Sequence, residues 1–160
     1  MKTTALLVSL TSFAIGAASV LASLAAVAQP KPDSAKASIL SGVYTAAQNE
    51  RGEAVHESAC ALCHGERLNG AGQADMPPSP AIAGLTFLHK WAGQPLASLF
   101  VYVKTKMPLG TPGSLSDQES IDAVAHMLAV SGMPAGDKDL PPDPTALANI
   151  VIELPPKNRK

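Results

Sequence analysis

Apolar residues recur at helical spacing in three stretches of the chain, and each stretch predicts a helix. The first covers about residues 45–63, where small and apolar positions fall four residues apart. The second follows Pro95, which suits a first helical position, and carries an apolar stripe on residues 96–103. The third begins after a capping-box string at residues 116–119, repeats apolar residues from Ile121, and ends at Gly132. The pattern predicts an all-α fold.

Segments rich in glycine and proline connect and follow these helices. Residues 66–83 hold two glycines and three prolines, which predict a loop. Beyond Pro134, further prolines interrupt the chain, although residues 145–149 allow one helical turn. We therefore expect a Pro-rich, extended C-terminal tail over residues 137–160. It either packs along the domain or contacts a partner.

The N-terminus has the pattern of an export signal. Lys2 supplies a positive charge, residues 5–20 are mostly apolar, and Ala26-Val27-Ala28 matches a cleavage site of small residues. We expect a signal peptide at residues 1–28, cleaved after Ala28. An uncleaved membrane anchor is the less favoured alternative, because serines and threonines dilute the apolar run. In both cases the folded part lies outside the cytoplasm.

Composition limits the class of protein. Removing 28 of the 160 residues leaves 132, which suffices for one domain. Aromatic residues make up only 4% of the chain and hydrophobic residues 46%, so we expect a non-protein group to fill part of the centre. The charge after cleavage is −2, because Lys2 is the only charged residue removed. We therefore expect no nucleic-acid partner, since nucleic-acid binding needs a concentrated basic surface.

The chain has only two cysteines, Cys60 and Cys63, and His64 follows them directly in the run CALCH. This C-x-x-C-H string is the attachment signal for haem c. Two thiols on one helical turn can each add to a porphyrin vinyl group, and the next residue then presents an imidazole to the iron. We predict one covalent haem c, linked through Cys60 and Cys63, with His64 as an axial metal ligand.

Three other roles of the cysteine pair have less support. A thioredoxin-like redox pair needs a βαβ context, but the residues around Cys60 favour helix. A zinc site needs four ligands, and the sequence has no second cysteine pair or closely spaced histidine pair. A disulfide across so short a spacing closes too little chain to stabilise the fold much.

The second axial position of the iron has several candidate ligands: Met76, Met107, Met127, Met133, His56, His89 and His126. Met76 is too close to His64 in sequence to pass around the porphyrin edge. Met127 and Met133 belong to the last predicted helix or its end, where packing and capping roles are more usual. Met107 follows a helix and precedes Pro108, so a loop can carry its thioether to the metal. His/Met ligation is typical of electron-carrying cytochromes c.

Several strings together resemble class I c-type cytochromes, in particular the small monohaem cytochromes that serve bacterial periplasmic dehydrogenases. They are GVYT from Gly42, Arg51-Gly52, CALCHG from Cys60, Phe87-Leu88 with Trp91, Leu99-Phe100 and MPLGTPGSLSDQE from Met107. The resemblance implies a cytochrome c domain at residues 42–136, after an N-terminal extension at residues 29–41. It also implies His64 and Met107 as the axial pair. Pro80 would accept a hydrogen bond from the His64 ring. Trp91 would either bind a haem propionate or form an apolar wall.

The chain departs from these cytochromes where the first and last helices are expected to cross. They usually cross through a small residue and an aromatic residue on each side. Gly52 is present, but the aromatic positions hold His56 and His126. We hypothesise that the two imidazoles meet at this crossing. The alternatives are two independent histidines facing solvent and, less favoured, a metal bound by the pair.

These expectations describe a periplasmic electron carrier without enzymatic activity. With both axial positions filled, substrate cannot coordinate the iron. A thioether ligand raises the potential, which suits electron acceptance from a dehydrogenase and delivery to an oxidase or another cytochrome. We expect these redox proteins to meet a patch near Leu109 and Gly110, oriented by Lys104 and Lys106.

Two other functional classes stay open. A labile sixth ligand would make the same haem frame a sensor or a peroxide-reducing protein. Alternatively, the chain is the electron-transfer subunit of a dehydrogenase complex, with its tail docked on the catalytic chain.

Overall fold

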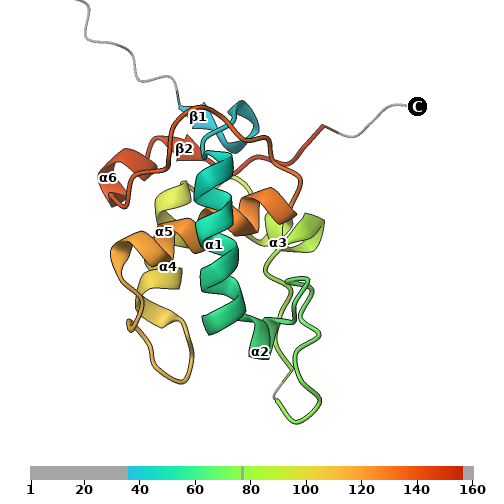
Figure 1. The fold of residues 1–160 in the computed structure, drawn as a ribbon. Coiled ribbons are helices and arrows are strands. Elements are labelled where there is room, and N and C mark those ends of the chain that lie inside the picture. The colour runs from blue at the N-terminus through green and yellow to red at the C-terminus, as the bar shows by residue number, and fades with distance from the viewer. Residues whose placement is uncertain (1–35, 77, 157–160) are drawn as a thin grey trace, which may run out of the picture. The chain divides into compact units, whose positions relative to one another are not determined.

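The computed structural model describes residues 36–76 and 78–156. The chain divides into two compact units, Met1–Asp33 and Ser34–Lys160, and all described residues belong to the second. The predicted signal peptide and its cleavage site lie outside the described residues, as do most of the expected N-terminal extension and the last four residues. The described part is mostly helical (Figure 1). Its elements in chain order are β1 (Ala37–Ser38), the 3-10 helix η1 (Ile39–Ser41), α1 (Ala46–Ala59), α2 (Ala61–His64), α3 (Gly84–Trp91), α4 (Leu96–Lys106), α5 (Asp117–Val130), α6 (Pro144–Leu147) and β2 (Ile150–Val151).

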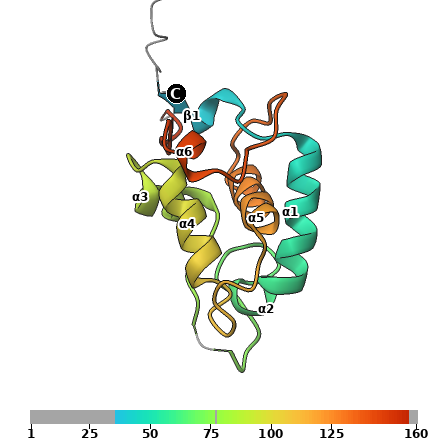
Figure 2. The ribbon, with the colours of Figure 1, turned by 90° about the vertical axis from the view of Figure 1, so that its left-hand side faces the viewer.

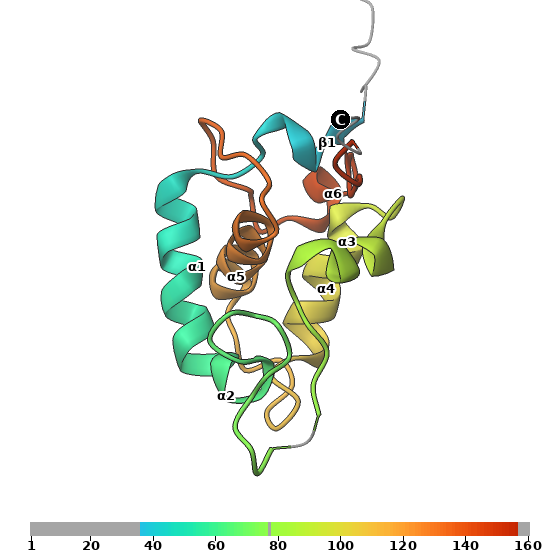
Figure 3. The same cartoon turned by 90° about the vertical axis from the view of Figure 1, so that its right-hand side faces the viewer.

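The three long helices lie where the apolar pattern predicts them, except that α1 ends at Ala59 and the short α2 carries Cys63. Local hydrogen bonds explain where α1 and α5 begin. Thr45 caps α1 by accepting a hydrogen bond from the Gln48 amide. Ser116 and Glu119 form a complete capping box at the start of α5. Helix α5 packs between α1 and α4 (Figures 2 and 3). All its residues from Ser120 to Leu128 are buried.

Helices α1 and α5 are in close contact at Gly52. A β-carbon placed on Gly52 would lie 1.9 Å from the Asp122 carbonyl oxygen, so only glycine allows this approach. Beyond it, the rings of His56 and His126 have centroids 5.4 Å apart and an interplanar angle of 35°. Their residues are 4% and 6% exposed. The hypothesis that the two imidazoles meet at the helix crossing is confirmed.

The two buried imidazoles predict a pH-dependent stability. Burial lowers the pKa of His56 and of His126 from the ordinary value, so the unfolded chain takes up protons more readily. The free energy of unfolding should be highest above about pH 6.5 and should fall as the pH drops towards 5, before most carboxylates titrate. Guanidinium unfolding of the wild type at pH 7.5 and 5.5, with a chelator present, measures this decrease in the free energy of unfolding.

The matched variants for this prediction are His126→Gln and His89→Gln. His89 is exposed on α3, so its replacement should leave the fall between the two pH values unchanged. His126→Gln should reduce the fall, because it removes one of the two titrating groups at the crossing. An equal fall in His126→Gln and wild type would show that the pair does not cause it.

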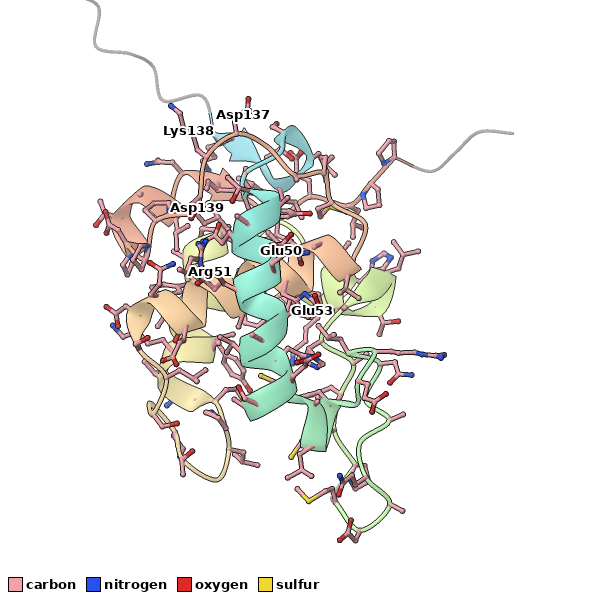
Figure 4. All side chains as sticks on the ribbon, in the orientation of Figure 1. Glu50, Arg51, Glu53, Asp137, Lys138 and Asp139 are labelled. Carbon is pink, nitrogen blue, oxygen red and sulfur yellow. The ribbon has the colours of Figure 1, made fainter. Side chains whose placement is uncertain are left out.

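A buried carboxylate joins α1, α5 and the segment that follows α5. Asp122, whose residue is 3% exposed, accepts hydrogen bonds from Gln48, Arg51 and Gln118. Arg51 also pairs with Asp139 at 2.6 Å, and Figure 4 shows both residues on this face of the molecule. Among the described residues, every fully buried side-chain polar atom has a hydrogen-bond partner. The network therefore stabilises the crossing without leaving an unpaired buried charge.

The segment after residue 136, expected to be an extended tail, packs against the domain. It contains α6 and β2, and it buries Leu140, Leu147 and Ile152 almost completely. Strand β2 pairs in parallel with β1, in the register Ala37↔Ile150 and Ser38↔Val151. Gln48 also exchanges two hydrogen bonds with the main chain of Leu140. This segment therefore completes the core at the end of the molecule that carries β1 and α6.

Candidate haem site

The cysteines and His64 lie where α1 turns into α2. Helix α1 ends at Ala59, Cys60 caps it, and the next turn presents Cys63 and His64. The amide of His64 donates to the Cys60 carbonyl at 2.9 Å, so a single turn fixes the three residues relative to one another. Burial, and to a lesser extent the neighbouring Cys63, raise the pKa of Cys60 to about 11, which keeps its thiol protonated near neutral pH. Both thiols are free and half-buried.

These three residues line a cavity of about 400 Å³, a volume within the range of ligand pockets. Most of the wall is apolar and comes from several helices and loops. Its apolar members include Ile82, Phe87, Leu99, Val103, Leu115 and Met127. The chemistry of the wall suits haem c, because two thiols for covalent attachment and a histidine ligand face one apolar space.

The ring of His64 is oriented by a hydrogen bond. Its Nδ1 lies 2.8 Å from the Pro80 carbonyl oxygen. A carbonyl oxygen only accepts, so Nδ1 carries the proton and Nε2 keeps the lone pair that a metal ligand needs. The hydrogen bond implied by the resemblance is present.

Three methionines reach this cavity. Met107 lines it from the residue that directly follows α4, and Met76 and Met127 line it from a loop and from α5. Met133 is buried elsewhere, beside the Tyr44 hydroxyl that donates to its carbonyl oxygen. The structure therefore places Met107 and His64 on one cavity. Met76 and Met127 line the same cavity, so position alone does not identify Met107 as the ligand.

Trp91 also lines the cavity, together with two residues that sequence analysis missed. Its ring meets that of Tyr102 edge-on, with centroids 5.7 Å apart, and the Lys90 ammonium lies 6.0 Å from both centroids. Lys90 adjoins Trp91 in sequence, and Tyr102 lies on the exposed face of α4. An indole N–H, a hydroxyl and an ammonium are donors suited to the carboxylates of a haem.

The fold and the cavity define the class of protein as a c-type cytochrome. Residues 47–127 match the family described as "Cytochrome C oxidase, cbb3-type, subunit III", and the chain belongs to this cytochrome c family. Covalently bound haem c is its cofactor, consistent with the spacing of Cys60 and Cys63. The cytochrome c domain supports electron transfer as the class of function. Over the described residues, helices are too short or too polar to span a bilayer.

One curated relative and one solved structure are similar to the chain. The thiosulfate dehydrogenase of Psychrobacter arcticus (strain DSM 17307 / VKM B-2377 / 273-4) is 35% identical over 83 residues, which cover 48% of this chain and 24% of the relative. The chain thus spans about a quarter of that relative's length. The crystal structure of the sulfane dehydrogenase SoxCD from Paracoccus pantotrophus gives a TM-score of 0.43 at 21% identity, covering 86% of this chain and 73% of that one.

Proposed function

We propose that the protein carries single electrons between larger redox proteins, with haem c bonded to Cys60 and Cys63 and held axially by His64 and Met107. One observation carries the proposal: a single apolar cavity brings together both thiols, the oriented imidazole and the thioether. When bound, haem c supplies one-electron cycling between Fe(II) and Fe(III).

Each residue of the site has a separate task in this proposal. Pro80 fixes the His64 ring and makes Nε2 a stronger ligand. Met107 would supply the second protein ligand of the iron, which would leave no open place for a substrate. The apolar wall excludes water, and Lys90, Trp91 and Tyr102 supply donors for carboxylates at the cavity wall.

A dehydrogenase as electron donor is supported by the likeness to a thiosulfate dehydrogenase. An oxidase or another cytochrome is the proposed acceptor. Leu109, which is 79% exposed and lines the cavity, offers a small apolar contact patch together with Gly110. Lys104 pairs with Asp117, so Lys106 is the better candidate of the two lysines for orienting an acidic partner. The pattern of residues 1–28 supports a periplasmic location.

The function is tested on the exported protein from its native host. Its mass should exceed that of the polypeptide by one haem, and its ferric form should show the weak far-red band of sulfur ligation. Stopped-flow mixing should show reduction by a periplasmic dehydrogenase and reoxidation by an oxidase. Rapid binding of carbon monoxide to the ferrous protein at neutral pH would instead favour the sensor or peroxide-reducing alternative.

A further inference from the structure

A second cavity, of about 510 Å³, opens beside the crossing of α1 and α5, and none of its lining residues lines the cavity of Cys60, Cys63 and His64. Its wall is about equally polar and apolar. Its members include Glu53, His56, Glu57, Glu66, Arg67 and His126. Glu53 and Glu57 are exposed on α1, so solvent reaches the cavity along this helix; Figure 4 labels Glu53.

The hydrogen bonds of the two histidines fix which ring nitrogen is free. His56 Nε2 lies 3.1 Å from the Gly65 carbonyl oxygen, which can only accept, so Nε2 carries the proton and Nδ1 is bare. His126 Nδ1 lies 2.9 Å from Oδ1 of Asn49, which likewise accepts, so Nε2 of His126 is bare. Each neutral ring thus keeps one unprotonated lone pair.

Within the described residues, the protein supplies no donor to either bare nitrogen. In the described part of the chain neither one makes a hydrogen bond to protein. Both rings line the second cavity, so a ligand that enters this cavity meets them.

We propose that this cavity binds a divalent transition-metal ion through Nδ1 of His56 and Nε2 of His126, with the Glu53 carboxylate as a third ligand. Imidazole suits zinc, copper and nickel. Histidines that bind metals usually donate their other ring N–H to a carbonyl or carboxylate, and both rings here make such a second hydrogen bond. The Glu53-x-x-His56 spacing places carboxylate and imidazole on one face of α1, as in the carboxylate-bridged metal sites of helical bundles.

Before the metal binds, the two imidazoles are already paired, with ring centroids 5.4 Å apart. Among the described residues, no three His, Cys, Asp or Glu side chains are grouped as metal ligands. Glu53 is exposed, so its side chain can rotate towards the ion, and water completes the coordination.

The charges around the cavity favour a cation. Glu53, Glu57 and Glu66 outnumber Arg67, and the charges of Glu53 and Glu57 act on both imidazoles. Burial lowers the pKa of both rings, so they are neutral at pH 7.5, as a metal ligand must be.

Zinc titration of the untagged ferric holoprotein at pH 7.5, followed by calorimetry, tests the site. We expect one Zn²⁺ per chain, and we expect His56→Gln and His126→Gln each to raise the Kd at least about tenfold. Asn49→Ala should also raise the Kd about tenfold, because it frees the His126 ring to turn. His89→Gln is the matched control and should leave the Kd unchanged.

Copper gives a readout that needs no variant. Bound Cu²⁺ should show hyperfine splitting from two nitrogens in its electron paramagnetic resonance spectrum, even if a histidine variant fails to fold. The haem absorption spectrum and circular dichroism report the fold of each variant. The proposal fails if the wild type binds no Zn²⁺ at millimolar concentration, if folded His56→Gln and His126→Gln bind as tightly as wild type, or if the copper spectrum shows fewer than two nitrogens.

Discussion

Gly52→Ala is expected to destabilise the protein by at least about 3 kcal/mol, the upper end of the cost of overpacking. The new β-carbon would lie 1.9 Å from the Asp122 carbonyl oxygen and 2.8 Å from the β-carbon of His126. The first of these contacts is with backbone, so a change of side-chain rotamer cannot relieve it. Only a separation of α1 from α5 can, and that would loosen the buried network around Asp122 and the histidine pair. Guanidinium unfolding followed by circular dichroism measures the loss.

Gly110→Ala is the matched control for this change. Apart from Gly110 and its two chain neighbours, no residue has an atom within 4 Å of the β-carbon it would add, and Gly110 does not have a positive φ. The free energy of unfolding should therefore change by less than about 0.5 kcal/mol. A Gly52→Ala protein within about 1 kcal/mol of wild type would contradict the account of the crossing.

The long helices could be predicted from sequence because each repeats its apolar positions over several turns. Helix α3 was not predicted, since its eight residues span little more than two turns and lack a capping side chain. The pairing of β1 with β2 was missed for a related reason: two-residue strands have no period, and their partners are more than 100 residues apart. The prolines after residue 140 predicted an extended tail with at most one helical turn, but the structure has α6 and β2 there. Isolated apolar residues between the prolines, such as Leu147 and Ile152, are buried.

The candidate site was predictable only where its residues are close in sequence or belong to a known pattern. Cys60, Cys63 and His64 form one local string, and the contact between His64 and Pro80 came from the resemblance. Tyr102 was missed because it lies on α4 outside the stripe of buried apolar residues, although it lines the cavity. No local signal places it on the cavity wall. The histidine pair was predictable, because His56 and His126 replace the aromatic residues expected at the helix crossing. The second cavity beside the pair was not predictable.

The proposed role of Met107 as an iron ligand can be tested by comparing three methionine variants. Three methionines line the cavity, and Met107→Leu, Met76→Leu and Met127→Leu each remove one sulfur at nearly constant volume. Met107→Leu should lower the midpoint potential by on the order of 0.1 V or more, since axial ligands span about 0.8 V in haem proteins. It should also abolish the far-red band and admit carbon monoxide to the ferrous protein, because leucine cannot coordinate iron.

The other two methionine variants make this test specific. Met76 and Met127 are expected to contribute only packing, so their leucine variants should keep the far-red band, exclude carbon monoxide and retain the potential of the wild type. Redox titration and absorption spectra of the three proteins distinguish the assignments directly. If Met107→Leu keeps the band while Met76→Leu or Met127→Leu loses it, then the thioether comes from the loop or from α5. The sequence distance of Met76 from His64, or the place of Met127 in a packed helix, would then be no obstacle to ligation.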